Sequence, residues 1–456
     1  IKKIGDIMNY TFYDTETTGL QYRYDYALTF SAKTFDKNFN IIDEINLQSK
    51  LRPGILPSVY AISTNKLKIS DLNKSELSFY EMTKKIYNYF KKNSPSFIIG
   101  HNSLNFDEEI LRSHFYQCLF PIFTTQLNGN LRGDTLMIAR AASAFSPGTI
   151  KIDLNKNGKL DFSLEGISTA NNFNHYDAHT AESDVIACME ILKKIKNHDN
   201  KFFKACMQTT SKKGVNEFVS KNLAFCFLKS IKKKIVITSC AKFESFYLGF
   251  DLTNNPDKFI NLSAENLVKY FKKNNSPFHI IKNNKQPIML DLSYKKYTNC
   301  NLLDEEILLR ANKIKSNKKF INSIKSAFEL IKKEFPVGAT IEEQIFLGGF
   351  PNISDRNLIE KFHKIDWCEK TDLISKFKDN RFRELGLRLI YEKNPYLLDN
   401  KSISLVEKTF HNRIYKTDNR PRSLKQTIAE FKDYKKKNLG KIKPPVAELE
   451  KYIKAI

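Results

Sequence analysis

The chain has 456 residues, which is too long for one ordinary core and predicts two or three domains. Of these residues 41% are hydrophobic, which is enough apolar material to pack them. No apolar run approaches the roughly 18 residues of a membrane span, which argues against a membrane protein. The seven cysteines form no C-x-x-C pair, which argues against a disulfide framework and a zinc cluster and predicts buried thiols in the cytoplasm. The net charge of +24 makes nucleic acid a plausible partner, although Lys, Asn, Ile and Phe are all abundant, as A/T-rich coding DNA produces.

Three strands are expected at the start, over residues 10–14, 27–35 and 41–47. The first is followed by Asp14-Thr15-Glu16-Thr17-Thr18-Gly19. Side chains two apart on a strand point to the same side, so Asp14 and Glu16 would face one spot at the end of a sheet. Two carboxylates on one spot repel unless a cation lies between them, and hard oxygen ligands suit Mg²⁺ or Mn²⁺. The stretch therefore favours a divalent-metal site over two solvated acids at a strand end.

The following segments alternate between helix and strand. We expect an extended segment over residues 51–68, an amphipathic helix over 78–91 and a short buried strand over 96–100. A loop then leads into a helix over residues 108–119. Asp107 lies at the start of this helix, where the helix dipole alone also favours an acid.

The last helix of this region is expected over residues 180–194, after a helix over 164–170. His179 would precede it and Asp184 would lie on its first turns, so that both could point at the same metal ions. His175, Asp177 and Glu182 are the competing residues nearby.

Three motifs, in this order, resemble those of the DnaQ-like exonuclease superfamily in its histidine-bearing branch. They are Asp14-x-Glu16 after an apolar strand, Gly100-His101-Asn102 with Phe106-Asp107, and His179 followed five positions later by Asp184. The resemblance implies an α/β fold: a ribonuclease-H-like (DnaQ-like) exonuclease domain with a mixed sheet, in which residues 61–67 line the groove for the terminal nucleotide.

The resemblance also implies a two-metal hydrolysis of phosphodiester bonds. Two Mg²⁺ ions, for which Mn²⁺ can substitute, would clamp the attacking and leaving oxygens. A neutral histidine has a pKa close to working pH and suits a general base. The implied metal ligands are Asp14, Glu16, Asp107 and Asp184, the implied base is His179, and Glu16 and Thr17 are expected to contact the substrate.

The second half of the chain contains a small β-rich region and a long helical one. Residues 201–233 carry basic helical segments, strands are expected over 235–239, 246–251 and 278–290, and a helix over 264–273. Residues 301–335 are helical and lysine-rich. Further helices are expected over residues 358–364, 370–377, 381–391, 404–410 and 424–437, with a closing helix from Pro444.

Over its whole length the chain resembles the exodeoxyribonuclease I family, on Arg132-x-Asp134, on residues 281–288 and on residues 341–350. This implies an exonuclease domain (1–197), a small SH3-like β-barrel domain (198–350) and an all-α C-terminal domain (351–456). It also implies a cytoplasmic monomer that degrades single-stranded DNA processively, 3′→5′, to 5′-mononucleotides in DNA repair and recombination. An RNA-directed exonuclease of the same superfamily and a catalytically idle nucleic-acid-binding protein are the alternatives.

Several positions, some basic here and some basic in relatives, concern binding to DNA and to a protein partner. The family docks the acidic tail of single-stranded-DNA-binding protein in a basic pocket, and Ser146 and Ser163 stand where relatives carry basic residues, which puts this partnership in doubt. Arg381 with Arg383, and Arg420 with Arg422, are compatible with lining a DNA channel or with a solvated helix face.

Overall fold

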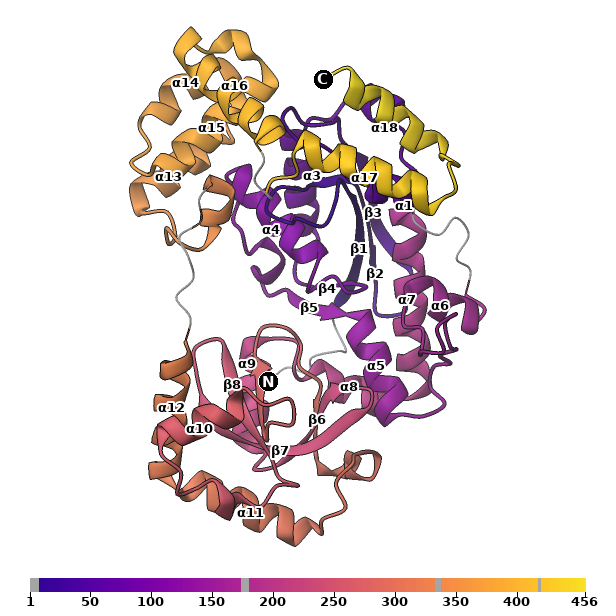
Figure 1. Ribbon diagram of the computed structural model, residues 1–456, viewed down its shortest axis with the longest axis vertical. Coiled ribbons are helices and arrows are strands. Elements are labelled where there is room, and N and C mark those ends of the chain that lie inside the picture. Colours follow the sequence, from indigo (N-terminus) through magenta and orange to yellow (C-terminus); the bar gives the residue numbers. More distant parts are fainter. Residues whose placement is uncertain (1–7, 174–179, 333–337, 339, 417–419) are drawn as a thin grey trace.

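The structure is a computed structural model, and it describes residues 8–173, 180–332, 338, 340–416 and 420–456. Its first domain is built on a five-stranded mixed sheet in the order β3-β2-β1-β4-β5 (Figure 1). β1 pairs antiparallel with β2 and parallel with β4, which confirms the predicted mixed sheet. The strands are β1 (Asn9–Thr17), β2 (Ala27–Phe35), β3 (Ile41–Gln48), β4 (Ser96–Gly100) and β5 (Leu131–Asp134).

Helices cover both faces of this sheet because the side chains of β1 alternate between the faces. Phe12 packs in a buried cluster with two helices, α5 and α7, and Tyr13 packs in a second cluster with α3 and α4 on the other face. This alternation places Asp14 and Glu16 on the face that α7 covers. The helices are α1 (Val59–Asn65), α2 (Ile69–Lys74), α3 (Phe79–Lys92), α4 (Asp107–Gln117), α5 (Thr135–Phe145), α6 (Leu164–Ala170) and α7 (Ala181–His198), with the 3₁₀ helix η1 (Thr124–Gln126).

The second domain contains a five-stranded antiparallel sheet in the order β10-β6-β7-β8-β9. Its closure into an SH3-like barrel stays a prediction. The strands are β6 (Phe225–Ser230), β7 (Lys233–Lys242), β8 (Phe246–Asp251), β9 (Phe278–Lys282) and β10 (Met289–Leu290). The helices are α8 (Asn200–Met207), α9 (Lys212–Lys221), α10 (Ala264–Phe271), α11 (Asp304–Ser316) and α12 (Lys318–Ile331), with the 3₁₀ helices η2 (Pro256–Lys258) and η3 (Leu292–Tyr297).

The prediction of helical segments through residues 201–233 is wrong for β6. This strand pairs with both β7 and β10 and buries Phe225, Cys226 and Phe227. Because a strand in the middle of a sheet is buried on both faces, it shows a continuous apolar run instead of the alternation that marks a half-exposed strand.

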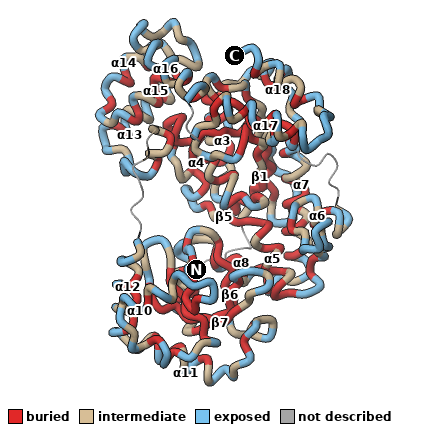
Figure 2. The backbone as a smooth tube through the Cα atoms, in the orientation of Figure 1, coloured by how far each residue is buried: buried red, intermediate tan, exposed pale blue. Residues whose placement is uncertain are grey.

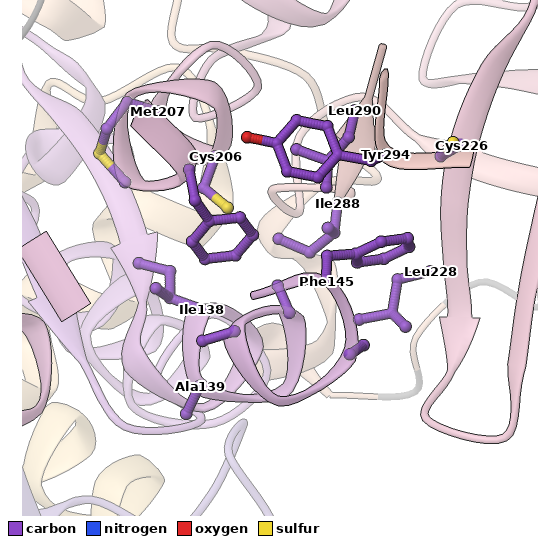
Figure 3. Packing of buried hydrophobic residues seen from close by; sticks show 14 of the residues in the cluster. Ile138, Ala139, Phe145, Cys206, Met207, Cys226, Leu228, Ile288, Leu290 and Tyr294 are labelled. Atoms are coloured by element: carbon purple, nitrogen blue, oxygen red, sulfur yellow. The ribbon is translucent and has the colours of Figure 1, made fainter. Parts of the chain in front are cut away.

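The first and second domains share a hydrophobic core (Figure 3). Phe145 of α5 lies 6.4 Å, ring to ring, from Tyr294 of η3, and Phe202 of α8 lies 6.2 Å from the same ring. Leu228 of β6 and Ile288 belong to the same buried cluster. The second domain is therefore packed firmly against the helix that follows β5.

The C-terminal region is helical, as predicted, and lies over the first domain at the opposite end from the second (Figure 1). Ile345, which lies before residue 351, shares a buried cluster with these helices. The boundaries 1–197, 198–350 and 351–456 stay predictions. The helices are α13 (Ile353–Phe362), α14 (Trp367–Ser375), α15 (Asn380–Lys393), α16 (Asn400–Tyr415), α17 (Leu424–Lys437) and α18 (Pro444–Lys454), with the 3₁₀ helices η4 (Ile341–Ile345) and η5 (Pro395–Leu397).

Helix α1 corrects the prediction of an extended segment over residues 51–68. Its buried residues include Val59, Ile62 and Ser63, and it packs against α17 and α18. The Ser63 hydroxyl lies 3.1 Å from the hydroxyl of Tyr434, a residue 371 positions away in the chain. The β-branched residues favour an extended chain locally, and this distant packing overrides the preference.

Two arginines that we expected in a DNA channel or on a solvated surface have structural roles instead. Arg381 is 6% exposed, pairs with Asp379 at 2.7 Å and donates to the Gly348 carbonyl. Arg422 pairs with Asp25 at 3.2 Å and with a glutamate of α17, Glu430, at 3.1 Å. Both arginines hold the C-terminal helices in place.

Six of the seven cysteines are buried, as predicted, and Cys368 of α14 is exposed. Figure 2 shows α14 at the outer edge of the molecule, among exposed segments. Within the described ranges, no helix is long and apolar enough to cross a membrane.

Candidate metal and substrate site

Three carboxylates from two elements meet at the end of β1. Asp14 and Glu16 extend from the strand, and Asp184 comes from the first turn of α7. One carboxylate oxygen of each lies within 4.8 Å of the others. The Thr180 side chain caps α7 by accepting from the Ser183 N–H, which fixes where this helix begins and so where Asp184 lies. The structure thus brings together side chains that are 170 positions apart in the sequence.

Asp107, the fourth predicted ligand, lies beside this cluster at the start of α4. Its carboxylate accepts a hydrogen bond of 2.5 Å from the hydroxyl of Thr15, the residue between Asp14 and Glu16. Asp107 is 4% exposed, and its charge contributes to raising the pKa of both Asp14 and Glu16. Sequence reasoning missed Thr15. Its position as a hydroxyl residue between the two acids of the first motif is the signal that could have identified it.

The carboxylates disfavour one another's ionised forms. Burial and then the charges of Asp184 and Asp107 raise the pKa of Glu16 to about 8. Burial and then the neighbouring carboxylates hold the pKa of Asp14 well above its ordinary value, and burial raises the pKa of Asp107 to about 7. Among the residues that the structure describes, every charged group that acts on Asp14 in this way is another carboxylate. An all-oxygen donor set with this excess of negative charge fits Mg²⁺ or Mn²⁺.

These shifts predict that the metal-free protein loses stability as the pH rises. The native pKa of Glu16 lies above the value of about 4.5 in an unfolded chain, so the native state binds more protons between about pH 4.5 and pH 8 and its stability falls over this range. Because each unit of pKa corresponds to about 1.4 kcal/mol, we expect Glu16→Gln to stabilise the metal-free protein by about 1 to 3 kcal/mol at pH 8 and by little at pH 4.5.

Urea unfolding in a chelator at the two pH values measures this difference. Glu244→Gln, at an exposed position between β7 and β8, is the matched control and should change stability equally little at both. A Glu16→Gln protein less stable than the parent at pH 8 would contradict the account.

Asp134 fixes the loop that leads to Asp107. It is fully buried, and its carboxylate accepts hydrogen bonds from the backbone N–H groups of Asn102 at 2.8 Å, Leu104 at 3.3 Å and Leu136 at 3.0 Å. Burial raises the pKa of Asp134 to about 6 although these N–H groups act in the opposite direction. The sequence marked Asp134 only as part of a family motif, and the structure makes it a support of the site.

Glu108 ties the same helix start to its surroundings. Its Oε1 atom accepts from Arg132 at 2.9 Å, from Arg112 at 3.2 Å and from the Thr125 hydroxyl at 2.5 Å. Burial alone would raise the pKa of Glu108, but Arg132 and Arg112 outweigh it and hold the pKa below its ordinary value. Glu108 is therefore an ionised, buried acid that is fully paired.

The second domain also supports the start of α4, through the loop between β9 and β10. Arg132 donates to the Asn284 carbonyl at 3.1 Å, and the side-chain oxygen of Gln286 accepts from the Asp134 N–H at 2.8 Å. Lys285 pairs with Glu109 at 3.3 Å. The start of α4, where Asp107 lies, is therefore held from both domains.

We expect Arg132→Met to destabilise the protein by about 3 to 5 kcal/mol, because it leaves Glu108 buried with an incomplete set of cations. Urea unfolding measures the change. In the double variant Arg132→Met with Glu108→Gln the uncompensated charge is gone, so part of the loss should be recovered. A loss below about 1 kcal/mol for Arg132→Met alone would show that Glu108 does not depend on this pair.

A cavity of about 290 Å³ adjoins Glu16. Asn65 and Leu67 line it, together with Ser31 and Asn46 from the neighbouring strands. That residues 61–67 line a groove for the terminal nucleotide stays a prediction. Thr17 is 7% exposed and donates to the Gly19 carbonyl at 2.9 Å, so it shapes the turn after β1. Contact of Glu16 and Thr17 with substrate stays a prediction.

His179, the predicted general base, lies outside the described residues, as do its rival His175 and the acid Asp177. Thr180 is the first described residue after them, and Asp184 follows within one turn of α7.

Two family models match the chain. The exonuclease model matches residues 11–192, and the model of the exonuclease I C-terminal domain matches residues 339–456. The first match contains all four carboxylates and His179. The second contains η4 and the helices from α13 to α18.

Known proteins match over nearly the whole length. The chain is 27% identical over 405 residues to exodeoxyribonuclease I of Buchnera aphidicola subsp. Schizaphis graminum, covering 84% of this chain and 82% of the relative. The crystal structure of E. coli exonuclease I with a dA16 oligonucleotide superposes with a TM-score of 0.84 at 19% identity, covering 97% of this chain and 98% of that one. A structure of SSB/exonuclease I with the inhibitor CFAM superposes with a TM-score of 0.80 at 18% identity, covering 99% and 100%.

Proposed function

The chain belongs to the exodeoxyribonuclease I family, and on this premise we propose that it removes nucleotides one after another from the 3′ end of single-stranded DNA. The observation that carries the proposal is the meeting of Asp14, Glu16 and Asp184 within 4.8 Å, with Asp107 beside them, in a chain that matches this family along more than four fifths of its length. The products would be 5′-mononucleotides.

The four carboxylates hold two Mg²⁺ ions in this proposal, and Mn²⁺ can replace them. When bound, the ions stabilise the charge on the attacking and leaving oxygens of the phosphodiester. Asp14 is central to the set, because its pKa responds to all three other carboxylates. Thr15 orients Asp107 through their hydrogen bond, and Asp134 holds the loop before it.

The protein's own groups then position the strand and move the proton. The cavity beside Glu16 receives the terminal nucleotide, and Glu16 and Thr17 contact it. His179, in its neutral form, takes the proton from the attacking water, since an imidazole with a pKa near 6.5 does this best close to neutral pH.

Single-stranded-DNA-binding protein is the proposed protein partner, supported by the fold shared with the SSB/exonuclease I structure. The two serines noted in the sequence have local roles. The Ser146 hydroxyl donates to Asp199 at 2.6 Å, and the Ser163 hydroxyl caps α6 and donates to Asp161 at 2.7 Å. An acidic tail would therefore have to find its cations elsewhere on the surface. Action as a monomer in the cytoplasm, in repair and recombination, rests on the family resemblance.

Digestion of end-labelled oligonucleotides tests the proposal. With Mg²⁺ present, a 5′-labelled single strand should shorten stepwise, a 3′-labelled strand should release its label at once, and duplex DNA should be spared. Degradation of RNA in place of DNA would move the chain to the RNA-directed branch of the superfamily. Binding without cleavage would favour an idle binding protein.

A further inference from the structure

A buried lysine ties the helix that carries Asp184 to the sheet. Lys33 of β2 is 6% exposed, and its Nζ atom pairs with Glu44 of β3 and, at 2.9 Å, with Glu182 of α7. Glu182 lies in the first turn of α7, two positions before Asp184. We call Lys33 and Glu182 the α7 clamp, because this pair joins β2 to the turn from which Asp184 extends.

Lys33 lies on the face of the sheet that carries the carboxylates. In the register of the sheet, Lys33 is opposite Phe12 of β1 and Glu44 of β3. Asp14 is opposite Ser31, which precedes Lys33 by two positions. Because opposite residues of paired strands share a face, as do residues two apart on one strand, Lys33 is one step along this face from Asp14. Helix α7 packs against β1 and β2 here (Figure 1).

The first turn of α7 also forms part of the wall of the cavity beside Glu16. Residues 180–182 line the cavity from the helix, and Ser31 and Asn46 line it from the sheet. A displacement of this turn would therefore alter the cavity as well as the position of Asp184.

The α7 clamp opposes a repulsion that the site itself creates. The three clustered carboxylates meet within 4.8 Å, and like charges push one another apart when no metal lies between them. Only Asp184 of these three lies on a helix, so the repulsion acts to lift the start of α7 from the sheet. Lys33 attracts the same turn toward β2. Burial alone would lower the pKa of Lys33, but its hydrogen bonds to Glu44 and Glu182 outweigh burial and raise the pKa, so the cation is kept.

We propose that Lys33 is a positioning residue for Asp184: its hold on Glu182 fixes the first turn of α7 in the place where the carboxylates can bind metal. The proposal deepens the proposed function and rests on it. An ion pair that served stability alone would achieve little here, since the Glu182 side chain is 55% exposed and exposed pairs contribute little to stability. Replacing a residue that supports metal ligands from behind typically changes metal affinity or activity by about 10- to 100-fold.

Metal-binding measurements on the whole protein test the clamp. Titration with Mn²⁺ in the absence of DNA, followed by the EPR signal of the free ion, gives the Kd for Mn²⁺. We expect Lys33→Met and Glu182→Gln each to raise this Kd about tenfold. Lys33→Arg keeps a cation at this position and should stay within about threefold of the parent. The Lys33→Met protein should fold, because an apolar side chain replaces a buried cation and both glutamates can turn to water.

The two substitutions separate positioning from a long-range effect of charge. Glu182→Gln removes a negative charge near the site, so Coulomb attraction alone would also weaken Mn²⁺ binding. Lys33→Met removes a positive charge, so Coulomb effects alone would tighten Mn²⁺ binding. Loss of the positioning contact predicts weaker binding in both variants.

Glu44→Gln is the matched control, since Glu44 is the other partner of Lys33 and lies on β3. It should leave the Kd for Mn²⁺ within twofold. Hydrogen–deuterium exchange gives a second readout at the start of α7, where the Asp184 N–H donates to the Thr180 carbonyl at 3.1 Å. Amides of this turn should exchange faster in the metal-free Lys33→Met and Glu182→Gln proteins, and at the parent rate in Glu44→Gln.

The outcomes are distinct. If the parent binds Mn²⁺ and cuts single-stranded DNA but Lys33→Met binds Mn²⁺ as tightly or more tightly, the positioning role is refuted while the proposed function stands. If Glu44→Gln weakens Mn²⁺ binding as much as Glu182→Gln does, the effect does not come from the hold on α7, and the proposal is likewise overturned. If the parent neither binds Mn²⁺ nor cuts single-stranded DNA, the proposed function itself fails.

Discussion

Replacing Asp14 by asparagine should lower the single-turnover rate of single-stranded DNA hydrolysis by at least about 10⁴-fold, because the two-metal clamp supplies much of the barrier reduction. Burial and the charges of Asp107, Asp184 and Glu16 all raise the pKa of Asp14. Asparagine keeps the shape and removes the charge, so the divalent ions of the proposed site would be held less tightly. Rapid-quench assays with a 5′-labelled strand and saturating Mg²⁺ measure the loss.

Folding has to be shown intact for this result to count. Asparagine removes a buried charge that is repelled by its neighbours, so the metal-free variant should unfold at no lower urea concentration than the parent. Asp177→Asn, which changes the competing acid of the third motif, is the matched control and should keep most of the rate. An Asp14→Asn protein that cuts DNA at a tenth of the parent rate or faster would contradict the role of Asp14.

Replacing His179 by alanine should slow the chemical step by about 10²- to 10⁴-fold, the usual contribution of a general base. The four carboxylates are untouched in this variant, so binding of Mn²⁺ should be nearly unchanged. The limb of the pH–rate profile that rises through the histidine pKa should disappear, because no neutral imidazole then accepts the proton. Single-turnover rates between pH 5.5 and pH 8.5 and a Mn²⁺ titration provide the two measurements.

His175→Ala is the matched control for His179, since it removes the rival histidine four positions earlier. It should leave both the rate and the pH profile close to those of the parent. A rate loss in His175→Ala and not in His179→Ala would show that our assignment of the base to His179 is wrong. Near full activity in both variants would show that neither histidine is the general base.

Local patterns were enough to predict the elements that carry the site. The alternation of β1 placed Asp14 and Glu16 on one side, and the spacing from the apolar residues of α7 placed Asp184 on its first turn. The two carboxylates of the strand meet the helix because the sheet face on which they lie is the face that α7 covers. These are short-range properties, and the family resemblance supplied the pairing between distant motifs.

Long-range contacts were the part that local reasoning could not supply. Helix α1 forms because α17 and α18 pack on it, and β6 is a central strand because β7 and β10 flank it. Arg381 and Arg422 read as surface cations in the sequence, yet each meets an acid that only the folded chain brings near.

The supports of the site were missed for the same reason. Nothing in the sequence around Asp134 shows that its carboxylate binds the backbone of residues 102 and 104. The reach of the β9–β10 loop, with Lys285 and Gln286, to the start of α4 joins two domains and has no local signature. Such contacts depend on how domains pack, which composition and periodicity do not encode.

The most direct test of the account is to locate the divalent ions. Crystals of the protein soaked with Mn²⁺ and thymidine 5′-monophosphate, with anomalous diffraction collected at the manganese edge, reveal their positions. The account predicts two anomalous peaks about 4 Å apart, both in contact with Asp14 and enclosed by Glu16, Asp107 and Asp184. Manganese bound elsewhere, with no peak among these carboxylates, would contradict it.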